Sequence, residues 1–193
     1  MHGVRRSLLR WQATSAGLPL YEVPIPKNAT NELYEHAMES SLSQLKERQD
    51  ISAIVFGDLF LRDIREYREK LVSGLGMKCL FPLWGRDTGE LARFFVDAGF
   101  RAIICTVDAR KIDVSFCGRE FNRSFFSEIP KNVDPCGENG EFHTFVYDGP
   151  IFRSPIEITR GETVERDGFY FADLLPLKEG EGSSESSLLR KSA

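Results

Sequence analysis

The chain has 193 residues, 41% of them hydrophobic and 28% charged, and its formal net charge at pH 7 is −4. That size and composition can bury the core of one domain, or of one domain with a small appendix. The acidic balance without a long Lys/Arg run excludes sequence-independent nucleic-acid binding, and no apolar run reaches the ~20 residues of a membrane span.

The N-terminus also lacks the apolar stretch and small-residue cleavage site of a signal peptide. We therefore expect a soluble cytoplasmic protein without a membrane or nucleic-acid partner. The four cysteines are Cys79, Cys105, Cys117 and Cys136, and none forms a C-x-x-C pair. This spacing favours neither a disulfide framework nor a structural metal site.

The first half of the chain alternates between helical and strand-like patterns. Thr30 is a candidate N-cap, Gly17 is a candidate helix stop, and Asp87 with Glu90 three residues later resembles a capping box. Helices are predicted over residues 5–16, 30–48, 62–75 and 88–98, and strands over residues 20–25, 51–56, 78–83 and 102–107.

This βα order predicts a doubly wound parallel sheet of the Rossmann-like nucleotide-binding type, joined by right-handed crossovers. Ligands of such sheets bind at the carboxyl ends of the strands. Gly57-Asp58 and Trp84-Gly85-Arg86 both follow predicted strands, so we expect them at the ligand-binding edge.

The pattern changes after Asp108. Residues 112–130 are polar and rich in Phe, which predicts one or two short helices, and the Asp167-Gly168 pair predicts a β-hairpin. The expected division is an α/β domain over 1–108, a smaller α+β subdomain over 109–177 and a disordered tail over 178–193.

Residues 134–144 read D-P-C-G-E-N-G-E-F-H-T and concentrate the chemically active side chains. Gly137 and Gly140 permit a tight turn, and the alternating pattern after Glu141 predicts a strand. The window therefore predicts a turn that presents carboxylates and an imidazole on a rigid strand. The alternative for such a segment is an ordinary surface turn with incidental charges.

Several of these segments together resemble the diphthine-ammonia ligase family. The resemblance is carried by Gly57-Asp58, by P-L-W-G at residues 82–85, by C-G-E-N-G-E-F-H-T at residues 136–144 and by D-G-P at residues 148–150, in that order. It covers residues 1–177, and the spelling of the turn is closer to the bacterial branch, which is linked to corrinoid salvage. The family belongs to the PP-loop ATPase superfamily.

The chain departs from the family at its start. Members open with a strand and an S-G-G-x-D-S loop that holds the nucleotide phosphates, and this sequence does not occur here. We expect a first βα unit to be missing, either because the chain begins at an internal Met or because the phosphate loop has been lost. In the second case catalysis is doubtful.

The resemblance implies an ATP-dependent amide-forming ligase that acts through an acyl-adenylate, with ATP and Mg²⁺ as cofactors. Its substrates would be ammonia and a small-molecule or protein-borne carboxylate. Charge on the phosphates would be balanced by Mg²⁺ near Asp58, or by Arg62, Arg65 and Arg86. The implied site residues are Glu138, Glu141 and His143 for catalysis, Gly137, Asn139, Gly140, Thr144 and Trp84 for substrate binding, and His2, Gly3, Gly57 and Asp58 for nucleotide binding.

Each assignment has a structural alternative. His143 is either a base or a hydrogen-bonded strand residue, Trp84 either stacks on a ligand or packs in the core, and Asp58 either binds Mg²⁺ or ribose or forms a turn. Cys136 lacks an identified base partner, so a structural thiol is favoured over a nucleophile.

Two alternatives to a ligase remain at this point. One is a non-catalytic module that has lost its phosphate loop and binds a small molecule, such as a corrinoid or an amide-bearing metabolite, at residues 138–144. The other is a metal-assisted hydrolase using Glu138, Glu141 and His143, which lacks a recognised ligand spacing.

Overall fold

The computed structural model describes residues 3–26 and 28–177. In chain order its elements are α1 (Arg6–Ser15), α2 (Asn31–Gln49), β1 (Ala53–Val55), α3 (Arg62–Ser73), β2 (Lys78–Leu80), α4 (Thr88–Asp97), β3 (Arg101–Asp108), η1 (Val114–Phe116), α5 (Arg123–Glu128), β4 (Phe142–Asp148), β5 (Ile158–Arg166) and β6 (Phe169–Pro176).

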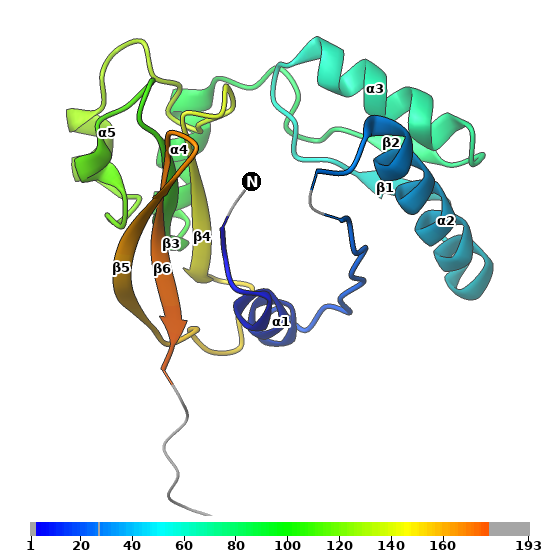
Figure 1. Ribbon diagram of the computed structural model, residues 1–193, viewed down its shortest axis with the longest axis horizontal. Coiled ribbons are helices and arrows are strands. Elements are labelled where there is room, and N and C mark those ends of the chain that lie inside the picture. The colour runs from blue at the N-terminus through cyan, green and yellow to red at the C-terminus, as the bar shows by residue number, and fades with distance from the viewer. Residues whose placement is uncertain (1–2, 27, 178–193) are drawn as a thin grey trace, which may run out of the picture.

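These elements form two lobes, which lie on opposite sides of Figure 1. The parallel lobe contains α2, β1, α3 and β2, and its two strands pair in parallel from Ala53 opposite Lys78 to Val55 opposite Leu80. The antiparallel lobe contains a four-stranded sheet in the order β4-β3-β6-β5, together with α1, α4, η1 and α5. The chain is thus an α/β part followed by a separate α+β part, which confirms the expected fold class.

Two expected strands differ from this arrangement. Residues 20–25 are not a strand. Pro24 and Pro26 cannot donate to a ladder, and Leu20, Tyr21 and Ile25 are exposed. The strand predicted at residues 102–107 forms, but it pairs antiparallel with β4 and β6 instead of extending the parallel sheet. A fully buried strand reads as the same apolar run in either kind of sheet, so its pattern does not reveal its partners.

The core of the antiparallel lobe is built on phenylalanines. Phe125 and Phe142 are almost fully buried, with ring centroids 5.1 Å apart and rings nearly perpendicular. Phe121 packs against both, at 5.6 Å and 6.1 Å. Each ring contributes buried apolar area, and the Phe125–Phe142 pair adds an edge-to-face contact, so this cluster fixes the beginning of β4 against α5.

The local signals in the sequence are confirmed. Thr30 Oγ1 accepts a hydrogen bond from Leu33 N, and Asp87 Oδ1 accepts one from Glu90 N at 2.7 Å. Asp167 and Gly168 both have positive φ in the turn between β5 and β6, as a tight hairpin requires. The division at residue 108 stays a prediction, and the tail at 178–193 lies outside the described residues.

Candidate functional site

The turn at residues 134–141 is closed by main-chain hydrogen bonds and depends on its glycines. Gly137 N donates to Asp134 O, and Gly140 N donates to Gly137 O, both at 2.9 Å. Gly137 has φ +71°, and a Cβ there would lie 2.7 Å from Phe142 O. A side chain at this position would therefore collide with the first residue of β4, which explains the glycine.

The acidic side chains of this turn accept hydrogen bonds from the main chain. Glu141 Oε1 accepts from Asp134 N at 3.0 Å and from Asn139 Nδ2 at 3.2 Å. Asp134 Oδ2 in turn accepts from Glu138 N at 2.8 Å. Glu141 and Asp134 are both buried. Their carboxylates therefore accept the hydrogen bonds that water would accept from these N–H groups on an exposed surface.

The side chain of Glu138 leaves the turn and reaches the parallel lobe. Its Oε1 accepts a hydrogen bond from Leu59 N at 2.7 Å, across 79 positions of sequence. The carbonyl oxygen of Leu59 accepts from Gly85 N at 2.8 Å. Glu138, Leu59 and Gly85 thus join three segments that the sequence singled out separately: residues 57–58, 82–85 and 136–144.

Gly57 and Gly85 lie after β1 and β2, at the same edge of the parallel sheet. Both are exposed, and a Cβ built on either would have no neighbouring atom within 4 Å. The open space lets a ligand approach the main chain closely, as nucleotides do at the carboxyl ends of parallel strands. The expected placement of these two turns at one edge is therefore confirmed.

Asp58 and Trp84 both have protein partners at this edge. Asp58 Oδ2 lies 2.7 Å from Arg68 Nε, although the two atoms are not aligned as a hydrogen bond. The guanidinium of Arg65 lies 4.7 Å from the ring centroids of both Trp84 and Phe81. Trp84 is half-buried in a cation–π cluster, so its structural role is established and any ligand contact is additional.

The second carboxylate oxygen of Glu141 is unusual. The residue is 3% exposed, and Oε2 has no hydrogen-bond donor within the described part of the chain. A buried carboxylate oxygen without a donor is costly. This atom is therefore the strongest indication of a missing polar or cationic partner in the turn.

His143 and Thr144 lie on β4, directly after this turn. His143 pairs with Thr106 and Thr144 pairs with Ile104, so Cys105 is an extra residue on β3. This is a β-bulge, a feature that re-aims neighbouring side chains and is frequent beside active sites. Both His143 and Thr144 are half-buried, so they form part of a rigid strand.

Cys136 is not suited to be a nucleophile. Its Sγ donates to the carbonyl oxygen of Thr88 at 3.3 Å. Burial, together with the nearby charges of Asp134, Glu138 and Asp87, raises the pKa of this thiol to about 12. The side chain is a neutral thiol at neutral pH, so its contact with the start of α4 is a packing contact.

The nucleotide-binding residues expected at the N-terminus are His2 and Gly3. His2 lies outside the described residues. Gly3 has φ +62°, and a Cβ there would lie 2.3 Å from Phe171 Cδ1 on β6. Gly3 therefore packs on the antiparallel sheet, and its proposed contact with a nucleotide stays untested.

Three residues that make hydrogen bonds in or to this turn have no role predicted from the sequence: Leu59, Asp134 and Lys111. Leu59 acts only through its main chain, and a main-chain contact leaves no pattern in the sequence. Asp134 was visible as the first residue of the acidic window but was given no role. Lys111 Nζ donates to Asn139 O at 2.5 Å, while its neighbour Asp108 is held by Arg110 at 2.7 and 2.9 Å.

The predicted arginines lie in different surroundings. Arg65 Nε donates a hydrogen bond to Glu69 Oε1 at 2.8 Å within α3, whereas Arg86 is exposed beside Gly85.

No group of three or more His, Cys, Asp or Glu side chains suited to a metal occurs among residues 3–26 and 28–177. None of the helices in that part of the chain is long and apolar enough to cross a membrane.

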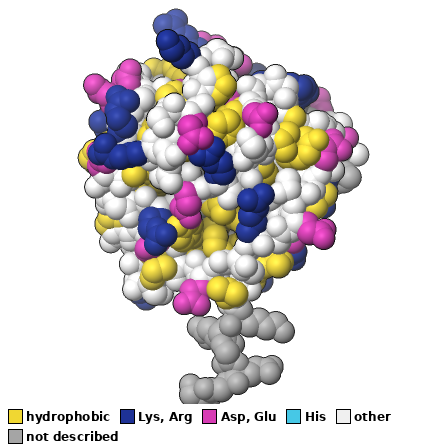
Figure 2. Space-filling model, turned by 90° about the vertical axis from the view of Figure 1, so that its left-hand side faces the viewer, with side chains coloured by type: hydrophobic (Ala, Val, Ile, Leu, Met, Phe, Trp, Pro, Cys, Tyr) yellow, Lys and Arg dark blue, Asp and Glu magenta, His cyan; other side chains and the backbone are white. Residues whose placement is uncertain are grey.

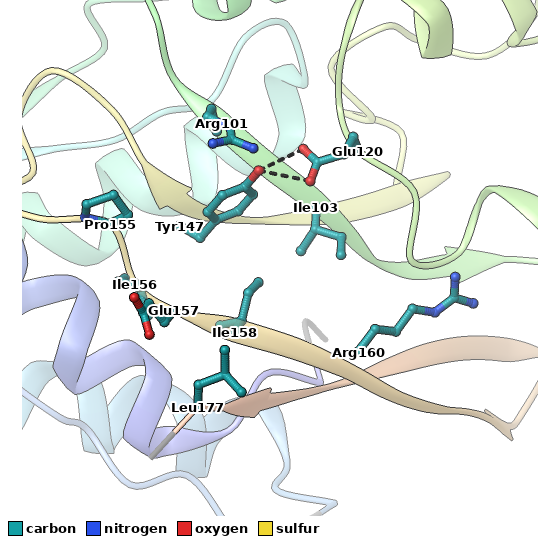
Figure 3. A pocket seen from close by; sticks show the side chains of 10 residues that line it. All are labelled: Arg101, Ile103, Glu120, Tyr147, Pro155, Ile156, Glu157, Ile158, Arg160 and Leu177. Carbon is teal, nitrogen blue, oxygen red and sulfur yellow. Dashed lines mark hydrogen bonds between the residues drawn. The ribbon is translucent and has the colours of Figure 1, made fainter. Parts of the chain in front are cut away.

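One open cavity of the antiparallel lobe lies at the other end of β3 and β4. A cavity of about 370 Å³ is lined by Arg101, Glu120, Tyr147 and neighbouring residues of β5. Tyr147 donates to Glu120 at 2.8 Å (Figure 3), and burial raises the pKa of Tyr147 to about 12. Seven residues of strand, ~23 Å, separate this end of the sheet from Glu141.

On the face carrying α5 and β5, acidic and basic side chains are interspersed (Figure 2).

Comparison with known proteins gives two kinds of match, one to a domain model and one to whole proteins. Residues 87–174 match the model of the diphthamide synthase C-terminal domain. The chain is 27% identical over 179 residues to the diphthine-ammonia ligase of Bos taurus, which covers 90% of this chain and 64% of the bovine protein.

Two further relatives carry the same name. The Homo sapiens protein is 27% identical over 181 residues, covering 86% of this chain and 67% of that protein. The Schizosaccharomyces pombe protein is 30% identical over 125 residues, covering 63% of this chain and 21% of that protein. The chain thus spans less than two thirds of the bovine and S. pombe relatives. By these matches, residues 87–174 resemble the diphthamide synthase C-terminal domain, and the chain as a whole is similar to diphthine-ammonia ligases.

Proposed function

We propose that the protein is an ATP-dependent ligase that joins a carboxylate to ammonia. The names of its relatives make diphthine the first carboxylate to test. The proposal is supported by the family match and by the hydrogen bonds that join the acidic turn to the Gly57 and Gly85 turns. A ligase of this kind must hold its nucleotide and its second substrate side by side.

ATP supplies the activation. A carboxylate oxygen of the substrate attacks the α-phosphorus and pyrophosphate leaves, which gives an acyl-adenylate. The nitrogen of ammonia then attacks the acyl carbon, AMP leaves with the bonding electrons, and the nitrogen gives up a proton. The protein has two tasks in this scheme: to align the reactants and to accept that proton.

The two glycine turns are the proposed nucleotide edge. Gly57 and Gly85 are exposed, with open space where a Cβ would stand, so adenine nucleotide can approach their main chain. Asp58 is the candidate partner for the ribose hydroxyls, as acidic residues at such edges are. The substrate carboxylate would then lie between this edge and residues 137–144.

The observation that carries the proposal is the buried Glu141 Oε2, which lacks a donor among the described residues. An ammonium ion supplies both a hydrogen-bond donor and the compensating positive charge that this oxygen lacks. We assign Glu141 the role of holding ammonium and accepting its proton. His143, two residues further along the same strand, is the second candidate acceptor.

The residues present do not assemble a magnesium site by themselves. Asp58 faces Arg68 at 2.7 Å, and the described residues contain no suitable group of three ligands. Mg²⁺ commonly relies on one or two carboxylates together with substrate phosphates. No step of the proposal therefore passes through Mg²⁺.

The non-catalytic binding module is not favoured, because the relatives are named as ligases. The deciding experiment incubates the chain with ATP, ¹⁵N-ammonium and a diphthine-bearing peptide. Mass spectrometry then follows the incorporation of ¹⁵N, and AMP and pyrophosphate are quantified. Incorporation that requires ATP supports the ligase. Tight binding of the peptide without AMP formation, at any ammonium concentration, would instead favour a binding module.

A further inference from the structure

We propose that Glu138 is a positioning residue, which aligns the nucleotide edge with the substrate turn by accepting the main-chain hydrogen bond of Leu59. This inference rests on the proposed function, because it assigns a role within the same site. It differs from the expectation that Glu138 accepts a proton from ammonium. A proton acceptor requires the carboxylate, whereas a positioning residue requires only an oxygen that accepts the hydrogen bond.

The main chain of Glu138 is held in place from one side. Its N–H donates to Asp134 Oδ2 at 2.8 Å, and Asp134 is held by the carboxylate of Glu141 at 3.0 Å. Gly137 and Gly140, both with positive φ, close the turn around it. The carboxylate of Glu138 therefore extends from a rigid base, and its position is set by the antiparallel lobe.

Leu59 is held equally firmly on the other side. The residue is 4% exposed, its N–H donates to Glu138 Oε1 at 2.7 Å, and its carbonyl accepts from Gly85 N at 2.8 Å. Leu59 follows Gly57 by two residues, so one main-chain unit ties both glycine turns to Glu138. Displacing Leu59 would displace both turns of the proposed nucleotide edge.

The contact joins two lobes whose described helices and strands make few contacts with each other. The helices and strands of the parallel lobe pack mainly on one another, as do those of the antiparallel lobe. Interfaces of this kind allow the two parts to shift relative to each other. A hydrogen bond that involves a charged acceptor contributes more than a neutral one, so Glu138 is well placed to select one alignment.

The partner of Glu138 decides which role fits. Leu59 N–H is a neutral donor, so an amide oxygen in the same place can still accept its hydrogen bond, although less strongly than a carboxylate does. A proton acceptor, in contrast, needs the carboxylate itself. Glutamine at position 138 therefore preserves positioning and destroys base catalysis, whereas alanine destroys both.

The test compares Glu138→Gln and Glu138→Ala, with Glu162→Gln as a control because Glu162 is exposed on β5. Hydrogen exchange of the Leu59 amide reports the contact directly. Calorimetry gives the Kd for ATP, and the ¹⁵N assay gives kcat and KM. We expect alanine to speed Leu59 exchange ~10-fold or more and to raise the Kd and KM for ATP by ~10-fold. Glutamine should rescue most of each loss.

Two outcomes would overturn the inference. If glutamine lowers kcat as far as alanine while Leu59 remains protected, the carboxylate is needed for chemistry and Glu138 is a base. If alanine leaves Leu59 exchange unchanged, the contact does not position the turn. A wild-type chain that binds ATP but makes no amide would contradict the ligase alone, since exchange and ATP affinity still decide the role of Glu138.

Discussion

The carboxylate of Glu141 accepts a hydrogen bond from the main-chain nitrogen of Asp134 at 3.0 Å, although the two residues are seven positions apart. Because Oε1 is used in this way, only Oε2 of Glu141 remains for a ligand. The same residue thus closes the turn and offers one unsatisfied oxygen. This division between the two oxygens leads to the first prediction.

Glu141→Gln should lower the rate of amide formation by ~100-fold or more. The thermal stability of the protein should change little. A glutamine oxygen can still accept from Asp134 N, but a neutral amide neither attracts ammonium nor accepts its proton. Steady-state ¹⁵N incorporation and thermal unfolding of the same preparations check this. The matched control is Glu162→Gln, and turnover at the wild-type rate in Glu141→Gln would exclude Glu141 from the mechanism.

Gly137→Ala should destabilise the protein by about 2–4 kcal/mol, because alanine adds both positive-φ strain and a contact of its Cβ with Phe142 O. The control is Gly168→Ala, where φ is +79° but no atom lies within 4 Å of the new Cβ, so strain alone should cost about 1 kcal/mol. Urea unfolding measures both. Equal losses of stability in the two variants would show that the structure shifts enough to remove the contact between the new Cβ and Phe142 O.

Gly57→Ala should leave the free energy of unfolding within about 0.5 kcal/mol of wild type, because φ is not positive and the added Cβ meets no protein atom. The Cβ would instead fill the space proposed for nucleotide, so the Kd for ATP should rise by ~10-fold. Calorimetry checks the affinity and urea unfolding checks the stability. Unchanged affinity would place the nucleotide elsewhere.

Cys136 should resist alkylation. With a pKa of about 12, its thiolate fraction at pH 8 is on the order of 10⁻⁴, against roughly a quarter for an ordinary thiol of pKa ~8.5. Iodoacetamide labelling followed by peptide mass mapping, with the unfolded chain as reference, measures this. Rapid labelling of Cys136 in the folded protein would contradict the assignment.

The same pKa shift predicts the direction of a pH effect. Because the folded-state pKa lies above the unfolded value, the stability contribution of the thiol is fully present below the unfolded pKa. It decreases as pH rises toward the folded pKa of about 12. Wild-type stability should therefore decrease above pH ~9, and by less in Cys136→Ala. A decrease of the same size in both proteins would assign the effect to other groups.

The sequence predicted features that depend on neighbouring residues. The caps at Thr30 and Asp87, the Asp167-Gly168 hairpin and the turn before Phe142 all follow from local backbone preferences. The placement of Gly57 and Gly85 at one edge also followed, because parallel strands end at the same edge. These features fix most of the candidate site.

The sequence could not predict which strands pair. Residues 102–107 are all buried and, apart from Thr106, apolar, so their pattern fits the centre of a parallel or an antiparallel sheet equally well. Nor could it predict the Leu59 contact with Glu138, because the donor is a main-chain N–H whose side chain gives no signal. Long-range pairing and main-chain partners are tertiary properties.

The central claim is that this chain uses ATP to form an amide from a carboxylate and ammonia. The most direct measurement is ATP-dependent incorporation of ¹⁵N-ammonium into a diphthine-bearing peptide, with AMP quantified in the same reaction. The account predicts one AMP formed for each ¹⁵N incorporated, and loss of both in Glu141→Gln. Absence of both products at saturating ATP, peptide and ammonium would contradict it.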